Sequence, residues 1–177
     1  WCIYIYIEND SNDNTRKILN KFEKMYTLNF IGEQLNLNIP HSVKLCTKGD
    51  GYNCKKRTIL LGKLRQKSLD IALEYQSDAI LMMDMDFVSF EFGELSEMIQ
   101  LWKVHDADAI FGMSKTKDNK LYDSGAVFPK ESLRKIRTSS NIVYVKSAFS
   151  GFGLYRTSSI SKYSARYDLN SGKIEHI

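Results

Sequence analysis

Strand patterns alternate with amphipathic helix patterns along the first 113 residues, and this alternation restricts the possible folds more than any other feature. Runs typical of buried strands are CIYIYI (2–7), AILMM (79–83) and DAIFGM (108–113). Helical periodicity starts near Thr15, covers 57–75 and returns in GELSEMIQLWKVH (93–105). Strands that alternate with helices are joined by right-handed crossovers and form a mainly parallel sheet. We therefore expect an α/β fold with helices on both faces of a central sheet.

The remaining segments carry weaker patterns. LNFIG (28–32) and SVKLC (42–46) are further strand candidates, and YDSGAVF (122–128), NIVYV (141–145) and GFGLYR (151–156) favour a mixed or antiparallel sheet edge. The helix that starts near Thr15 presents one apolar stripe, formed by Ile18, Leu19, Phe22, Met25 and Tyr26. With 177 residues and no visible linker, we expect a single domain over 1–177. Because the chain begins with Trp and ends in KIEHI, we expect it to be a piece of a longer protein.

Composition excludes several classes of protein. Hydrophobic residues make up 43% of the chain, and no apolar run approaches the ~20 residues that span a bilayer. The net charge is +4, but acidic residues are interleaved with basic ones, so we do not expect a nucleic-acid partner. Cys2, Cys46 and Cys54 lack a C-x-x-C spacing and predict free thiols in a reducing compartment. We expect a soluble, cytoplasmic protein without a membrane span.

Two aspartates stand one residue apart where the apolar run 79–83 ends, in the order Asp84, Met85, Asp86. Without a cation, each carboxylate would raise the pKa of the other. Ligands of open α/β sheets bind beyond the carboxyl ends of strands, and Mg²⁺ or Mn²⁺ commonly takes one or two carboxylates together with substrate phosphates. The pattern therefore predicts a Mn²⁺ or Mg²⁺ site at this strand end, with an Asp-rich turn as the alternative.

Several motifs resemble, in the same order, those of glycosyltransferases of the GT-A type. They are IYIENDSNDNT, KLRQKSLDIAL, ILMMDMD, SGFGLYR and the late EHI. The chain is similar in particular to the cryptococcal capsule mannosyltransferase group. The resemblance implies a single Rossmann-like GT-A domain, a UDP- or GDP-linked sugar donor and a divalent ion that bridges its diphosphate. It also implies a glycan or glycoprotein acceptor whose hydroxyl receives the sugar.

The resemblance assigns donor contacts to two segments. The acidic turn after the first strand matches the segment that contacts base and ribose, and comprises Glu8, Asn9, Asp10 and Ser11. Carboxylate and amide groups can hydrogen-bond both parts of a nucleoside. The alternative role of this segment is to cap the following helix through Ser11, Asn12 or Asp13, and both roles can hold. Arg57 and Arg65 match basic helix positions where a guanidinium contacts base or phosphate.

The resemblance also assigns the metal ligands. Asp84 would lie nearest the ribose with Met85 beside the donor, and Asp86 would be the firmer metal ligand. His176 matches the late histidine that completes the metal coordination in similar transferases.

The residues that would act on the acceptor are less clearly indicated. Asp123 is the expected general base, with Glu175 and Asp168 as alternatives. Gly151 would let the backbone approach a sugar, and Phe152 could stack on it. The sequence lacks the tryptophan-acid-acid motif common near the end of such enzymes, which leaves the base and the stereochemistry open.

Two other functions fit parts of the sequence. An apolar strand that ends in DMDFV also resembles haloacid-dehalogenase-like phosphatases, in which the first Asp attacks phosphorus and the second acts as acid and base. That motif usually lies on an early strand and precedes a second acidic pair, whereas here it begins at Asp84 with no such pair after it. The other alternative is a non-catalytic module that binds a nucleotide or carbohydrate.

Overall fold

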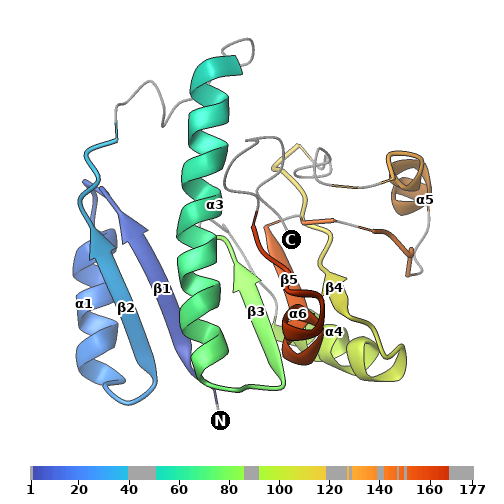
Figure 1. Cartoon of the computed structure of the whole chain (residues 1–177), viewed down its shortest axis with the longest axis horizontal. Coiled ribbons are helices and arrows are strands. Elements are labelled where there is room, and N and C mark those ends of the chain that lie inside the picture. The colour runs from blue at the N-terminus through green and yellow to red at the C-terminus, as the bar shows by residue number, and fades with distance from the viewer. Residues whose placement is uncertain are drawn as a thin grey trace. The chain divides into compact units, whose positions relative to one another are not determined.

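The structure is a computed structural model that describes residues 2–39, 51–85, 92–118, 127, 129–138, 142–146, 148–149 and 151–167 (Figure 1). These residues form a mixed α/β structure, as the alternating pattern predicts. They group into two compact units. The first contains the described residues up to Tyr75 together with Tyr167, and the second contains those from Gln76 to Arg166.

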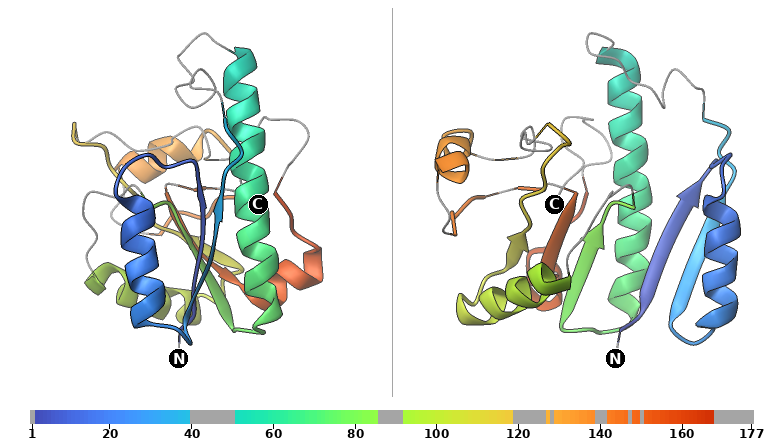
Figure 2. Two further views of the ribbon diagram at one scale, coloured as in Figure 1. Left: turned by 90° about the vertical axis from the view of Figure 1, so that its left-hand side faces the viewer. Right: turned by 180° about the vertical axis from the view of Figure 1, so that it is seen from behind.

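The first unit contains a parallel pair of strands between two helices. β1 (Tyr4–Asn9) pairs with β2 (Phe30–Leu35) over their whole lengths. α1 (Thr15–Met25) connects the two strands, and α3 (Gly51–Glu74) lies on the opposite face of this small sheet (Figure 2). The parallel pairing and the helix start at Thr15 confirm the predicted crossover in this unit. α3 begins six residues earlier than the pattern at 57–75 indicates.

The side of α1 that faces the sheet carries apolar and polar contacts together. Leu19 is buried, whereas Glu23 accepts a hydrogen bond of 2.6 Å from the Tyr6 hydroxyl. Burial, together with this hydrogen bond, raises the pKa of Tyr6 above its usual 10.0. The other four members of the predicted apolar stripe are exposed: Ile18, Phe22, Met25 and Tyr26. Because polar contacts occupy the side toward the sheet, the helix is rotated so that most of its apolar stripe faces outward.

The second unit contains a three-stranded sheet in the order β3-β5-β4. β3 (Ala79–Met83) and β4 (Ala109–Phe111) each pair antiparallel with β5 (Phe152–Arg156), so β3 and β4 run in the same direction. α4 (Phe92–Val104) connects β3 to β4. The unit also contains two seven-residue helices, α5 (Ser132–Thr138) and α6 (Thr157–Tyr163).

This sheet departs from two predictions. The segment GFGLYR, expected at a sheet edge, supplies the middle strand, because Phe152 to Tyr155 are all buried and can cover both faces. Residues 142–145 of the predicted strand NIVYV are not in a strand, and SVKLC and most of YDSGAVF lie outside the described residues. The described sheets are small, and only β1 and β2 are paired in parallel.

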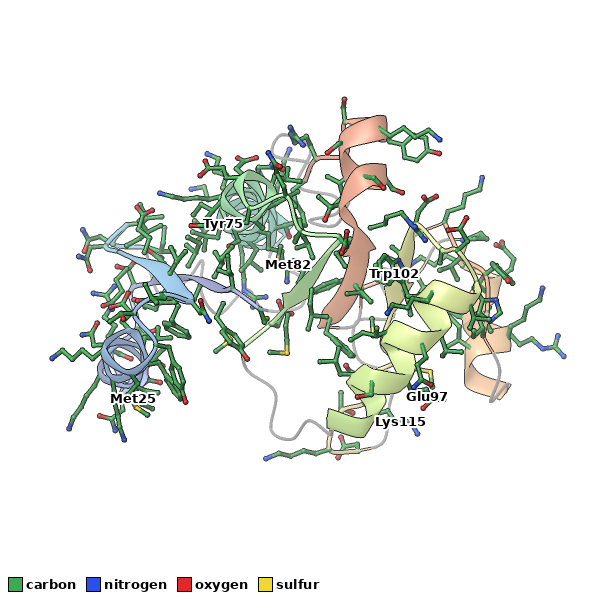
Figure 3. All side chains as sticks on the ribbon, turned by 90° about the horizontal axis from the view of Figure 1, so that it is seen from below. Met25, Tyr75, Met82, Glu97, Trp102 and Lys115 are labelled. Atoms are coloured by element: carbon green, nitrogen blue, oxygen red, sulfur yellow. The ribbon has the colours of Figure 1, made fainter. Side chains whose placement is uncertain are left out.

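The core of the second unit lies between α4 and the sheet. Met98 and Trp102 of α4 pack against Phe152 and Leu154 of β5, and Figure 3 shows Trp102 on the side of the helix that faces the strands. The i, i+3, i+4 and i+7 spacing of the apolar residues of α4 produces this face. Each fully buried side chain of this size contributes about 1.5–3 kcal/mol. The guanidinium carbon of Arg156 lies over the Trp102 ring, 4.9 Å from its centroid, in a cation–π contact.

Gly112→Ala is expected to destabilise the second unit by about 1–3 kcal/mol, the usual cost of overpacking a core. A Cβ atom at Gly112 would lie 2.0 Å from Cε1 of the buried Phe152 ring. In a Phe152→Leu background the same substitution should cost less, because the ring that it strikes is gone. Urea unfolding of the parent, Gly112→Ala, Phe152→Leu and the double variant measures the cost of the substitution in both backgrounds. Equal costs in the two backgrounds would contradict this packing.

Two predictions from composition can be compared with the described residues. None of the described helices is both long and apolar enough to cross a bilayer. Cys2 is an exposed free thiol, as predicted, whereas the side chains of Cys46 and Cys54 lie outside the part of the chain that the structure describes.

Candidate functional site

The D-x-D pattern begins where β3 meets the start of β5. The Asp84 amide donates a hydrogen bond of 2.7 Å to the Gly151 carbonyl, one step beyond the Met83–Phe152 pair of the ladder. Gly151 is buried and has φ 87°, a backbone conformation that glycine adopts without a steric penalty. Asp84 is half-buried, and the Met85 side chain is 75% exposed. The first aspartate and the glycine of SGFG are therefore neighbours at the open end of this sheet.

Phe152 has a different environment from the one predicted for a sugar-stacking residue. Its side chain is only 6% exposed and belongs to the core that α4 covers. The ring lies directly over Gly112 of the segment that follows β4. The structure gives Phe152 a packing role, and among the described residues Asp84 and Met85 follow β3 at this end of the sheet.

The acidic segment expected to be a turn begins within β1, because the strand continues to Asn9 and not to residue 7 as predicted. A buried ion pair lies at its centre. Glu8 accepts a 2.6 Å hydrogen bond from the Ser11 amide through Oε1 and a 2.5 Å hydrogen bond from Arg16 Nε through Oε2. The Glu8 side chain is 5% exposed and that of Arg16 is 27% exposed. A buried carboxylate requires such a cation and donors, since its desolvation is otherwise uncompensated. Both Glu8 oxygens thus have partners within the chain.

The same turn is tied to the segment that follows β2. The Leu37 amide donates to Asn9 Oδ1 at 3.1 Å, and the Ile39 amide donates to Asp10 Oδ2 at 2.8 Å. Arg16 adds a hydrogen bond from Nη1 to Asn36 Oδ1 at 2.7 Å and another from Nη2 to the Leu35 carbonyl. The carboxyl ends of two parallel strands lie at the same edge, and these bonds fix both segments there.

The capping alternative is not confirmed, because the N-cap of α1 is Asn14 and its side chain makes no capping hydrogen bond. Asp13 Oδ1 accepts a hydrogen bond of 2.8 Å from the Thr15 amide, the first residue of α1. This hydrogen bond lowers the pKa of the Asp13 carboxyl below its usual value. Asp13 thus closes a short turn one residue before the N-cap, while the segment from Glu8 to Ser11 is bonded to α1 and to the residues after β2.

Arg57 and Arg65 lie on α3, eight residues apart, which is a little more than two helical turns. Arg57 is exposed and Arg65 is half-buried. Beside Arg65, the buried Gln66 accepts a hydrogen bond of 2.9 Å from the Tyr167 amide and donates one of 2.7 Å to Asp70. Gln66 thus anchors the buried Tyr167 on α3, at the point from which the chain continues toward its C-terminus.

The predicted site residues that the structure describes fall into three groups, one of which is Arg57 and Arg65 on α3. Glu8 to Ser11 lie together in the first unit, and Asp84, Met85, Gly151 and Phe152 lie together in the second. The residues outside the described part are Asp86, Asp123, Asp168, Glu175 and His176. Among the described residues, no three His, Cys, Asp or Glu side chains are arranged to hold a metal ion. The metal site and the base stay predictions.

Arg16 is a site residue that the sequence reasoning did not find. The available signal is that a glutamate directly after a strand pattern needs a cation if it is buried, and Arg16 is the first basic residue after Glu8. Its position on the first turn of α1 lets one guanidinium reach Glu8, Leu35 and Asn36 together.

Arg16→Met is expected to destabilise the first unit by about 1–3 kcal/mol, because it leaves the Glu8 carboxylate buried without its cation. The double variant Arg16→Met/Glu8→Leu should be more stable than Arg16→Met alone, since no buried charge remains. Urea unfolding followed by circular dichroism measures both. Lys17→Met, at the exposed neighbouring position, is the control and should change little. An Arg16→Met protein as stable as the control would contradict the role of this ion pair.

A scan against protein-family models finds no match to this chain, and searches of curated proteins and of solved structures also find none.

Proposed function

We propose that this chain is a metal-dependent glycosyltransferase that moves a sugar from a UDP- or GDP-linked donor to a hydroxyl of a glycan or glycoprotein. One observation carries the proposal: the 2.7 Å hydrogen bond from the Asp84 amide to the Gly151 carbonyl. The D-x-D pattern and the SGFG segment are distant in sequence, and each is a separate candidate for contact with the donor. Their adjacency at the carboxyl end of β3 supports a common ligand at this point.

The assignment of the chain to a particular type of α/β fold also belongs to the proposal. We infer a Rossmann-like GT-A domain, supported by the parallel β1–α1–β2 unit and by the β3–α4–β4 crossover. The antiparallel β5 between β3 and β4 supports a mixed sheet. In this assignment the enzyme works in the cytoplasm on a soluble donor.

The proposed chemistry divides among three groups of residues. Asp86, with Asp84 and His176, would hold Mn²⁺ or Mg²⁺, which neutralises the diphosphate as it leaves. Arg57 and Arg65 would contact the base or phosphates, and the acidic turn would face the nucleoside. Within that turn, both oxygens of Glu8 already bind Ser11 and Arg16, so we assign Glu8 to positioning the turn.

A thermal-shift panel of UDP- and GDP-sugars, each with and without Mn²⁺, tests the proposal. A ligand that binds only the folded protein stabilises it by roughly 2.7 kcal/mol at a hundred times its dissociation constant. We expect one nucleotide class to stabilise the protein when Mn²⁺ is present, and the same donor to release its nucleotide in a turnover assay.

The same assays distinguish the alternatives. Phosphate release from a simple monoester, with no release of nucleotide from any sugar donor, would replace the proposal with a phosphatase. Stabilisation by a donor that is never turned over would indicate a binding module.

A further inference from the structure

The outward side of α1 and the turn after it carry an apolar strip, defined as Ile18, Phe22, Met25, Tyr26 and Leu28. Their exposed fractions run from 41% for Phe22 to 89% for Leu28. The strip is continuous with aromatic rings of the sheet, because the Phe22 ring lies 6.1 Å from that of Tyr26 and 5.7 Å from that of Phe30. Scattered exposed apolar side chains are ordinary, but a contiguous group of this kind marks an interaction surface.

Three lysines adjoin the apolar strip. Lys17, Lys21 and Lys24 recur at spacings of four and three residues, so they follow one side of α1. Together with Asn20 and Met25 they line an open hollow on the helix surface. The hollow is thus lined by three lysine residues next to Met25 of the apolar strip.

The carboxylates in and just before α1 are bonded away from the lysine side of the helix. Glu23 is the one carboxylate within α1, and it is bonded to Tyr6 on the side of the sheet. Asp13, just before α1, accepts a hydrogen bond from the Thr15 amide at the N-terminus of the helix. The lysine side of α1 is therefore positively charged, and the occupant that complements it is anionic as well as apolar.

We propose that α1 binds the surface of an anionic lipid bilayer, with the apolar strip at the boundary between headgroups and acyl chains and the three lysines against lipid phosphates. An exposed apolar strip beside a lysine-rich face is the pattern of helices that lie in the membrane interface. Aromatic side chains such as Phe22 and Tyr26 suit this depth, and lysine stems extend along the apolar layer toward the phosphates. This inference does not depend on the proposed transferase activity.

A second copy of the chain fits this surface less well. A symmetric dimer places the same patch of both subunits face to face, which would bring six lysines together from two copies of Lys17, Lys21 and Lys24. Like charges opposed across an interface cost several kcal/mol. A bilayer of anionic lipids instead supplies about 1 kcal/mol of attraction for each lysine near its surface.

Sedimentation with lipid vesicles tests the proposal. The protein should bind vesicles of phosphatidylcholine mixed with phosphatidylglycerol, bind pure phosphatidylcholine vesicles much more weakly, and dissociate as salt is raised. The triple variant Lys17→Gln/Lys21→Gln/Lys24→Gln should lose about 100-fold in affinity, which is the loss of three contributions of about 1 kcal/mol. Phe22→Ser/Met25→Ser should lose at least about tenfold, since two apolar side chains leave the interface.

The control is Lys55→Gln/Lys63→Gln/Lys115→Gln, which removes three exposed lysines away from α1 and should bind as the parent does. Circular dichroism checks that each variant is folded. Absence of vesicle binding, or equal loss in the α1 triple variant and the control, would overturn the proposal. So would a concentration-dependent dimer that Phe22→Ser/Met25→Ser abolishes, because the apolar strip would then be a contact between copies of this chain.

Discussion

Removal of divalent metal ions with excess EDTA is expected to abolish sugar transfer, and added Mn²⁺ or Mg²⁺ to restore it. In the proposed transferase the D-x-D pattern holds the ion that neutralises the diphosphate as it leaves. The loss and the recovery of activity are both measured as release of nucleotide from the sugar donor. Undiminished transfer in excess EDTA would disprove the metal assignment.

Asp86→Asn tests the same site without a chelator. The substitution keeps the shape of the side chain and removes its charge, so we expect a folded protein whose donor turnover falls by orders of magnitude. Glu97→Gln is the matched control, because Glu97 is an exposed carboxylate on α4 (Figure 3). Near-normal turnover by a folded Asp86→Asn protein would show that the metal ligand is another residue.

Asp123→Asn is expected to lower transfer to the acceptor by ~10²- to 10⁴-fold, the usual contribution of a general base. The base acts on the acceptor hydroxyl and has no part in binding the donor. Mn²⁺-dependent affinity for the donor, measured by titration calorimetry, should therefore stay close to that of the parent. Asp86→Asn, in contrast, should weaken both donor binding and transfer.

Two results would reassign Asp123. Loss of donor binding in Asp123→Asn would place its carboxylate in the metal or nucleotide site. Normal transfer would mean that the base is another residue, and Glu175→Gln and Asp168→Asn would be the next variants to test.

Local patterns in the sequence were sufficient to predict most of the described elements. The apolar run 79–83 matches β3 in full, the periodicity at 93–105 differs from α4 by one residue at each end, and α1 begins at the predicted Thr15. These elements are predictable because alternation and 3.6-residue periodicity depend only on neighbours in the chain. The positions of Glu8 and Asp84 at the ends of β1 and β3 follow from the same patterns.

Tertiary structure decided the pairing of strands and the partners of polar side chains. β5 became the middle, antiparallel strand because its residues are buried on both faces, and this brings Gly151 to Asp84 and Phe152 into the core. The contact of Arg16 with Glu8 and the outward rotation of the stripe on α1 depend on which face of that helix meets the sheet. Hydrophobic periodicity identifies the apolar face of a helix. Which face packs on the sheet is decided by competition between burial of apolar side chains and formation of buried hydrogen bonds. That competition involves residues distant in the sequence.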